Sequence, residues 1–162
     1  SLPGTVSTNT RLSNYDLISP AAEVKFKEPF KFFENISILD KLGSIQSIPQ
    51  LAFFGEYADN PQAKKKNTGY MAGLKLGAEK IAGWGDWQFG YNYAMLGKDA
   101  VLDILPDSDR IGGKTGIRGH EGTMQYGLGK NTFLSLDYYQ GWTMAANPVP
   151  QHVVQVDWNL KF

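Results

Sequence analysis

Short runs of alternating apolar and polar residues cover most of this chain. In the closing run, VVQVDWNLKF, one parity is entirely apolar and the other is almost entirely polar. The apolar parity consists of Val154, Val156, Trp158, Leu160 and Phe162. Successive side chains of a strand point to opposite faces, so this run predicts a β-strand with one apolar and one polar face.

The same alternation recurs in six segments before the closing run. These segments lie near residues 22–30, 51–57, 70–78, 87–95, 122–128 and 133–142. Phe54 breaks the pattern of its segment. With the closing run, the pattern predicts seven strands of about ten residues, close to the length that a tilted strand needs to cross a membrane.

The predicted connections alternate between short and long. Two are tight turns, Ala82–Asp86 and Gly129–Asn131, and three are longer and polar, Ala58–Asn67, Gly97–Thr115 and Thr143–Gln151. Short periplasmic turns and long external loops are typical of outer-membrane barrels. On this interpretation the closing strand ends at the periplasmic side.

Two segments do not fit the alternation. Residues 31–44 carry several large apolar residues and are predicted to form a helical or plug-like connection. Residues 1–17 are predicted to be a weakly structured N-terminal segment, because TVSTNT offers little apolar surface. Residues 1–162 are therefore interpreted as a single β-barrel domain or barrel fragment, with seven clear strands and a doubtful eighth.

A soluble sandwich or lipocalin-like barrel is the alternative for such a pattern. The apolar parity tolerates Ala and Gly, and the polar parity is rich in Gly, Ser, Gln and Asn, as in a barrel with a wet interior. Aromatic residues also gather at the predicted strand ends, where membrane-interface girdles lie. These interface aromatics are Tyr70, Trp84, Trp87, Tyr138, Trp142, Trp158 and Phe162. The predicted fold class is therefore an all-β, antiparallel transmembrane β-barrel.

Composition adds several exclusions. Sixteen basic residues balance sixteen acidic ones, so no nucleic-acid partner is expected. Cysteine is absent, which excludes disulfides and thiolate metal sites. The 18 glycines and the 13% of aromatic residues are typical of short strands and tight turns. No segment approaches the roughly 18 consecutive apolar residues of a transmembrane helix.

Three segments carry a resemblance to a known family. The closing run, with its final Phe162, looks like the C-terminal sorting signal of Gram-negative outer-membrane proteins. NTFLSLDYYQGW followed by VVQVDWNLKF resembles the C-terminal hairpin of the putative bacterial porins, and SPAAEVKFK resembles a strand opening in that group. The resemblance spans roughly residues 18–162. Porins of that kind usually have about sixteen strands, so this chain resembles their C-terminal part or a small relative.

The resemblance implies an outer-membrane porin of a Gram-negative bacterium that lets small hydrophilic solutes diffuse passively. It implies contact with outer-membrane lipid and lipopolysaccharide, recognition of Val153–Phe162 by the barrel assembly machinery, and a homo-oligomeric state. The basic loop at Lys64–Lys66 is a candidate for contact with lipopolysaccharide phosphates, and plain solvation is the favoured alternative. The alternative is a small non-conducting barrel that serves as a structural anchor or adhesion module.

The polar parity supplies the candidate lumen-lining residues. They are Lys25, Lys27, Glu56, Lys75, Glu79, Gln88, Asn92, Gln125, Asp137, Tyr139, Gln155, Asp157, Asn159 and Lys161. Such side chains set selectivity through charge and width. The alternative for any one of them is that paired charges only brace the wall, and the mixed signs predict no ion preference.

No enzyme, cofactor or metal site is expected. His120 and His152 are the two histidines, and Ser108 and Ser135 have no catalytic motif around them. The RGHEG stretch, residues 118–122, offers one His and one Glu, too few for a metal site, and is interpreted as a solvated strand extension. Four aspartates at residues 99–109 lack the spacing of a calcium loop.

Overall fold

The computed structural model describes residues 16–31, 48–100 and 115–160. Most of the predicted helical or plug-like connection and most of the N-terminal segment lie outside these residues. The doubtful upstream strand, Ser108, Lys161 and Phe162 also lie outside them. The expectations for these residues stay predictions.

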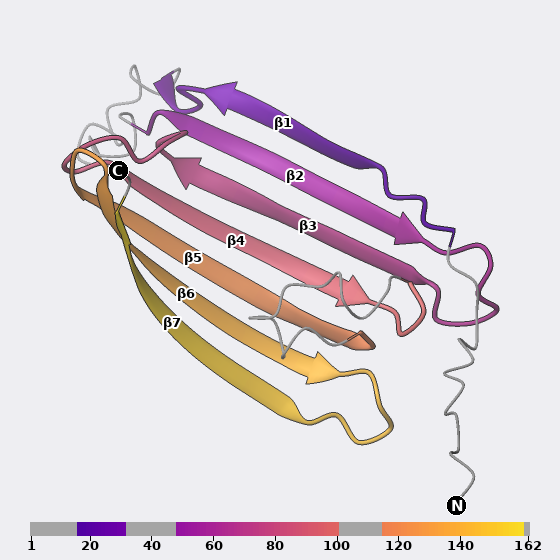
Figure 1. The fold of residues 1–162 in the computed structure, drawn as a ribbon. Helices are drawn as coiled ribbons and strands as arrows, with labels where there is room; N and C mark the ends of the chain where they lie inside the picture. The colour runs from indigo at the N-terminus through magenta and orange to yellow at the C-terminus, as the bar shows by residue number, and fades with distance from the viewer. Residues whose placement is uncertain (1–15, 32–47, 101–114, 161–162) are drawn as a thin grey trace, which may run out of the picture.

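Seven antiparallel strands form one sheet, in which each strand pairs with its neighbours in sequence (Figure 1). The strands are β1 (Ala21–Lys27), β2 (Gln50–Asp59), β3 (Thr68–Gly77), β4 (Trp87–Leu96), β5 (Ile117–Gly129), β6 (Thr132–Thr143) and β7 (Pro150–Leu160). The predicted all-β antiparallel architecture of seven strands is confirmed. Within the described residues, no helix is long and apolar enough to cross a bilayer.

The predicted alternation of short and long connections is confirmed for two of them. Two residues join β5 to β6 at one end of the sheet, here the short-turn end, and residues 97–116 join β4 to β5 at the opposite, long-loop end. The prediction is wrong for the β3–β4 connection, since residues 78–86 are more numerous than the β2–β3 and β6–β7 connections, residues 60–67 and 144–149.

At the short-turn end, Lys130 and Asn131 join β5 to β6, and Asn131 takes a φ of 63°, which Asn tolerates well. The β3–β4 turn is closed by the Asp86 carboxylate, which accepts hydrogen bonds of 2.8 Å from the backbone N–H groups of Ala82 and Gly83. Tight turns of this kind fix the register of the strands they join.

At the opposite, long-loop end, Asn60 ties two loops together. Its side chain is fully buried, and Nδ2 donates a 2.9 Å hydrogen bond to the carbonyl oxygen of Asp99 after β4. Asn67 Nδ2 in turn donates to the carbonyl oxygen of Asn60 at 3.0 Å. These bonds hold the β2–β3 loop against the beginning of the β4–β5 connection.

The sheet exposes its apolar face, whereas its polar face is buried in part, with Lys25, Lys27, Glu56 and Lys75 exposed. The large apolar side chains of alternate positions are exposed, and on β7 Val156 and Trp158 are each 69% exposed. On the opposite face, polar residues such as Gln50 and Asn92 are only 8% and 9% exposed. This arrangement is the reverse of a water-soluble sheet, in which the apolar face is the buried one.

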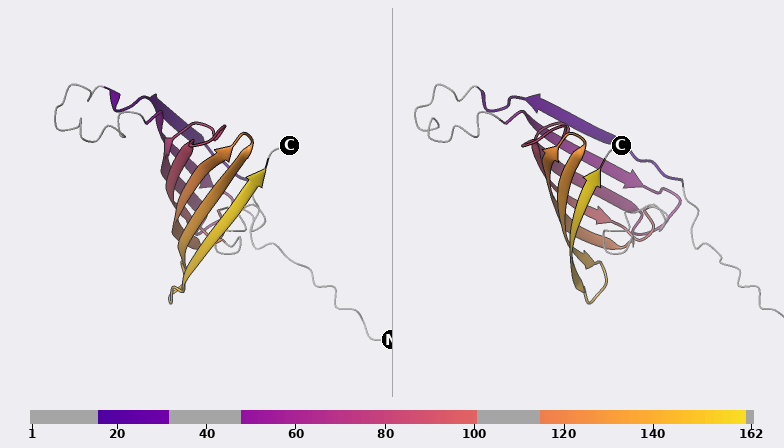
Figure 2. Two further views of the ribbon diagram at one scale, coloured as in Figure 1. Left: turned by 90° about the vertical axis from the view of Figure 1, so that its left-hand side faces the viewer. Right: turned by 60° about the vertical axis from the view of Figure 1, so that its left-hand side comes forward.

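The sheet is curved and open (Figure 2). In the part of the chain that the structure describes, β1 pairs only with β2 and β7 pairs only with β6. The two outermost strands therefore each carry one edge with no strand beside it. The described strands therefore form an open, curved sheet that does not close into a barrel.

Candidate functional site

The polar face of the sheet, here called the inner face, is built by the register of the strands. Residues that lie directly opposite each other on neighbouring strands share a face. Because every neighbouring pair is in register, rows of inner-face residues run across all seven strands. The central row is Glu23, Phe54, Gly73, Asn92, Glu121, Tyr139 and Val153.

The register places the candidate lumen-lining residues of the described strands together on the inner face. These are Lys25, Lys27, Glu56, Lys75, Gln88, Asn92, Gln125, Asp137, Tyr139, Gln155, Asp157 and Asn159. Glu79 lies in the β3–β4 turn, and its carboxylate is 3.1 Å from Lys25 Nζ. Their exposure to a water-filled lumen stays a prediction.

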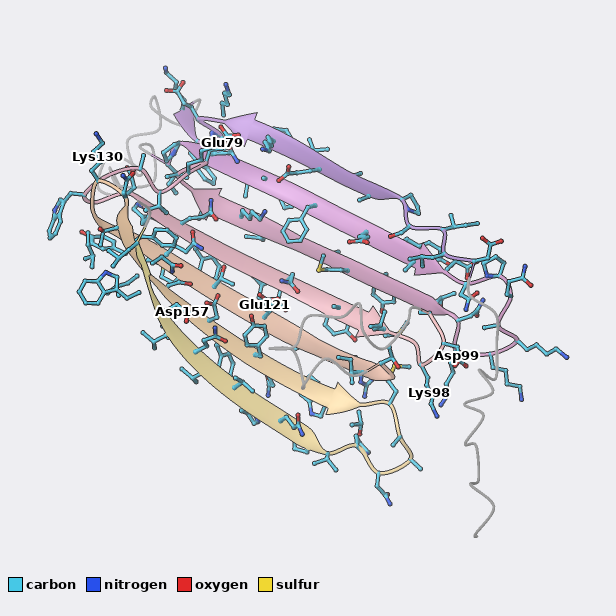
Figure 3. The ribbon with its side chains drawn as sticks, in the orientation of Figure 1. Glu79, Lys98, Asp99, Glu121, Lys130 and Asp157 are labelled. Atoms are coloured by element: carbon cyan, nitrogen blue, oxygen red, sulfur yellow. The ribbon has the colours of Figure 1, made fainter. Side chains whose placement is uncertain are left out.

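Hydrogen bonds along and between strands hold the acidic part of this face. Asn92 Nδ2 on β4 donates to Glu121 Oε2 on β5 at 2.8 Å. On β6, Ser135 Oγ donates to Asp137 Oδ2, and on β7 Gln155 Nε2 donates to Asp157 Oδ2, both at 2.8 Å. A carboxylate that accepts such bonds keeps a defined position, so the negative charges are fixed to the wall (Figure 3).

Phe54 belongs to the inner face, which explains why it breaks the apolar alternation of β2. A side chain at Gly73 would meet Phe54, since a Cβ atom added to this glycine would lie 2.6 Å from Phe54 Cζ. The ammonium of Lys75, two residues along β3, lies 5.1 Å from the centre of the Phe54 ring, within cation–π range. The aromatic ring therefore covers a glycine and supports a lysine on an otherwise polar face.

The inner face has two parts that differ in charge: β1–β3 carry both signs, with Glu23 and Glu56 among the lysines, whereas the described residues of β5–β7 carry only acidic groups. Within the described strands, its lysines, Lys25, Lys27 and Lys75, all lie on β1 and β3. Its carboxylates on β5, β6 and β7 are Glu121, Asp137 and Asp157, and no lysine or arginine shares the inner face of those three strands. The signs are therefore mixed on β1–β3 and uniformly negative on β5–β7.

The Lys25–Glu79 ion pair lies at the short-turn end of the inner face. Lys25 Nζ also lies 3.5 Å from Glu23 Oε2. The hydrogen bond from Lys25, and next its positive charge, hold the pKa of the exposed Glu79 carboxyl below its ordinary value. Because both side chains are exposed, the pair adds little to stability.

Glu121 is an inner-face residue that parity in the sequence did not identify. In the sequence it stood out only as part of RGHEG, as a metal ligand with too few partners. Continuing the alternation of Thr123 and Gln125 one step back along β5 would have placed Glu121 on the polar face. The structure shows that residues 118–122 are an internal part of β5, paired with both β4 and β6.

The opposite, outer face carries most of the predicted interface aromatics at its two ends. Tyr70 and Trp142 lie toward the long-loop end, Trp87 and Trp158 lie toward the short-turn end, and Tyr138 lies in the middle of β6. Trp84, in the β3–β4 turn, meets the Tyr126 ring edge-on with a centroid distance of 6.4 Å. Between the two groups lies a wholly apolar row of Phe89, Met124, Leu136 and Val156.

Both histidines lie on the outer face, toward the long-loop end. His120 Nδ1 is hydrogen-bonded to the Tyr91 hydroxyl at 2.6 Å, and His152 Nδ1 to the Tyr138 hydroxyl at 2.8 Å. Each histidine is thus engaged with a tyrosine on the apolar side of the sheet. Among the described residues, no group of three or more His, Asp or Glu is placed to hold a metal ion.

Comparison with known proteins gives one match. A model of the family described as putative porins matches residues 21–162. This range begins at β1 and contains all seven strands. No curated protein and no solved structure matches the chain.

Proposed function

Because the chain belongs to the putative porin family, we propose that it forms part of the wall of an outer-membrane channel through which small hydrophilic solutes diffuse passively. The family and the antiparallel sheet give the general porin character. The passive route, the membrane location and the barrel size are the proposed parts.

The reversed distribution of apolar and polar side chains carries this proposal. Outer-face residues such as Val154, Val156 and Trp158 are more than 60% exposed, whereas inner-face Gln50, Asn92 and Ser135 are buried. A continuous exposed apolar face of this extent would be unfavourable in water. It is the surface expected where lipid replaces water outside the wall and solutes pass on the polar side.

The dimensions of the strands support a membrane position. A ten-residue strand such as β3 or β4 is about 33 Å long, and a tilt of about 40° reduces its height to about 25 Å. That height equals the apolar band of outer-membrane barrels. The two aromatic groups of the outer face then lie at the two interfaces, with the long loops external and the short turns periplasmic.

The free edges of β1 and β7 support a barrel larger than these seven strands. In hydrocarbon every backbone N–H and C=O needs a partner, so an open sheet edge is not stable there. An eight-stranded barrel would bring β1 and β7 almost together and would fill its interior with side chains. The open arc instead fits a barrel of about sixteen strands, which is wide enough for an aqueous channel.

The proposed channel favours cations along the β5–β7 part of its wall. Glu121, Asp137 and Asp157 present fixed negative charge there, and among the described residues the inner face of those strands carries no lysine or arginine. The channel is proposed to act without a cofactor and without catalysis. In support, the two histidines are bonded to tyrosines on the lipid side of the sheet.

The proposed location is the outer membrane of a Gram-negative bacterium, with lipid and lipopolysaccharide around the outer face. The C-terminal strand is the proposed contact for the barrel assembly machinery, and the assembled protein is proposed to be a homo-oligomer. The alternating, exposed apolar side of β7 supports the strand's proposed role in assembly.

Planar-bilayer recording of the purified full-length protein tests the proposal. We expect discrete conductance steps that show no gating at low voltage and a modest preference for K⁺ over Cl⁻. A folded, membrane-inserted sample that gives no steps would refute diffusion and favour the small non-conducting anchor. A protein that stays folded and monodisperse without detergent would refute the membrane placement.

A further inference from the structure

Arg118 is an exception on the outer face. Among the residues of the described strands, it is the only lysine or arginine on that face, where its strand neighbours are Met95 and Trp142. Its side chain is exposed, and no carboxylate of the described residues lies within ion-pair distance of it. A charge on a lipid-facing surface is unfavourable unless a partner offsets it.

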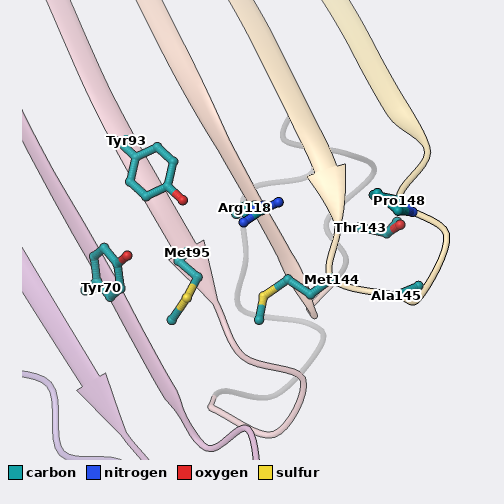
Figure 4. Close-up of a pocket in the computed structure, with 8 residues that line it drawn as sticks. All are labelled: Tyr70, Tyr93, Met95, Arg118, Thr143, Met144, Ala145 and Pro148. Carbon is teal, nitrogen blue, oxygen red and sulfur yellow. The ribbon is translucent and has the colours of Figure 1, made fainter.

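A hollow of about 310 Å³ lies beside this arginine (Figure 4). Arg118, Tyr70 and Tyr93 line it from three strands, and Met144 and Pro148 from the β6–β7 loop close its long-loop side. The Tyr70 and Tyr93 rings lie 6.1 Å apart. The hollow therefore combines a guanidinium, two phenol hydroxyls and an apolar rim.

The surroundings of the hollow carry little negative charge. Asp59 is the only acidic residue on the outer face of the described strands; it ends β2 at the same long-loop end, opposite Thr68, and does not line the hollow. Its carboxylate accepts a 3.1 Å hydrogen bond from Asn67 Nδ2. His120 lies next to the hollow, with ring centroids 5.0 Å from Tyr93 and 5.8 Å from Trp142. The charge complement of this hollow is therefore an anion.

We propose that this hollow binds the phosphate of a lipid headgroup in the external leaflet. The inference rests on the proposed membrane position of the sheet. Arg118 is the second residue of β5 at the long-loop end, so in that position it lies at headgroup depth. At that depth an anionic lipid headgroup pairs with the Arg118 guanidinium, which has no acidic partner among the described residues.

The chemistry of the lining fits such a headgroup. A guanidinium binds phosphate through two parallel N–H donors, and tyrosine hydroxyls can donate to the remaining oxygens. Met95 and Met144 offer flexible apolar contacts beside the charge. The acyl chains would then continue along the apolar outer face toward Phe89 and Met124, which face the same side.

Retention of lipid A by the purified full-length protein tests this site. The protein is incubated in detergent with bis-phosphorylated lipid A or with its dephosphorylated form, washed, and analysed by native mass spectrometry. We expect Arg118→Gln to bind the phosphorylated form about tenfold more weakly, the loss expected for one charge-assisted hydrogen-bonding group at a surface. Arg118→Lys should keep part of the binding, because lysine keeps the positive charge but lacks the planar guanidinium that binds phosphate through two N–H donors.

Lys98→Gln and Lys130→Gln are the matched controls, because each removes one exposed positive charge outside the hollow (Figure 3). Both should bind lipid A like the unmodified protein. Equal losses in the controls, or equal binding of the dephosphorylated lipid, would overturn the site. Unchanged lipid binding by Arg118→Gln together with a changed oligomeric state would also overturn the site. That result would assign the hollow to contact between two copies of the chain.

Two further measurements separate this inference from the proposed channel. A shift in gel mobility between heated and unheated Arg118→Gln shows whether the variant is folded, and Arg118→Lys supplies a second variant if it is not. Conductance is recorded for the same samples. A protein that binds lipid A through Arg118 but does not conduct contradicts only the channel. A conducting protein whose lipid binding ignores Arg118 contradicts only this site.

Discussion

Asn92 on β4 and Glu121 on β5 meet through a 2.8 Å hydrogen bond in the central row of the inner face. The Asn92 side chain is almost fully buried, and its amide fixes the carboxylate of a residue 29 positions later. The bond makes Glu121 a charge of defined position on the wall rather than a mobile side chain.

Glu121→Gln is expected to lower the cation-to-anion permeability ratio. One charge at a few ångströms in water attracts a cation and repels an anion by about 1 kcal/mol or less each, so the ratio should fall by at most about thirtyfold. The reversal potential of the channel in a KCl gradient measures it. Glu121→Asp keeps the charge and is the control. If Glu121→Gln and Glu121→Asp behave alike, the carboxylate only braces the wall.

Glycine-to-alanine substitutions on the two faces are expected to have opposite effects. At Gly73 a Cβ would lie 2.6 Å from Phe54 Cζ and 2.7 Å from Asn92 Cβ, so Gly73→Ala should cost about 1–3 kcal/mol of unfolding free energy through overpacking. At Gly122 nothing lies within 4 Å of the added atom. Gly122→Ala should therefore be neutral or stabilise by about 0.5–1 kcal/mol. Urea titration in detergent measures both, and equal effects would contradict the assigned packing.

Arginine substitutions at two consecutive residues of β7 test which face meets lipid. Val156 points outward in the apolar row, whereas Gln155 points inward, opposite Asp137. Val156→Arg should lower the unfolding free energy in lipid vesicles by about 2–4 kcal/mol, the cost of a cation near the bilayer midplane. Gln155→Arg should change it by less than about 1 kcal/mol, since it gains acidic neighbours.

The same pair of variants distinguishes a water-soluble sheet. Val156 is 69% exposed, and in water a substitution at such a surface position usually changes stability by no more than about 0.5 kcal/mol. A Val156→Arg protein as stable as the parent in vesicles would therefore argue against lipid contact at the outer face.

The Glu79 carboxyl is expected to titrate below its ordinary pKa because Lys25 donates a hydrogen bond to it. A lowered folded-state pKa means that the pair stabilises the fold at neutral pH. This contribution is lost as the pH falls through the lowered pKa. Lys25→Gln should return the pKa of Glu79 toward its ordinary value, as measured by NMR titration of the labelled carboxyl. Lys130→Gln should leave it unchanged, and a shift there of the same size would contradict the assignment.

Much of the fold could be predicted from alternation and turn composition. The seven strands and the separation of polar from apolar side chains follow from a period of two residues, and the turn at Gly129–Asn131 follows from its composition. The β3–β4 connection, residues 78–86, is longer than the predicted turn Ala82–Asp86. Phe54 was the exception to the alternation, because it is an aromatic residue at a position that the alternation assigns to the polar face. Its place over Gly73 depends on a glycine 19 positions later, which no local pattern connects to it.

The candidate site was predicted as a set of residues but not as an arrangement. Parity assigned Asn92 and Asp137 to the polar face, yet Glu121 was missed because RGHEG was interpreted as a motif on its own. Parity also could not show that the strands with Glu121, Asp137 and Asp157 are neighbours, which gathers three carboxylates in one part of the inner face. That gathering depends on the order of the strands in space.

The sequence by itself determined which side chains share a face, since the alternation of a strand is a local property of the backbone. Only the tertiary structure decided which residues stand side by side. It paired Asn92 with Glu121, placed His120 beside Tyr93, and left Arg118 among apolar neighbours on the outer face. These relations follow from the register between strands, which turns and long connections set across tens of residues.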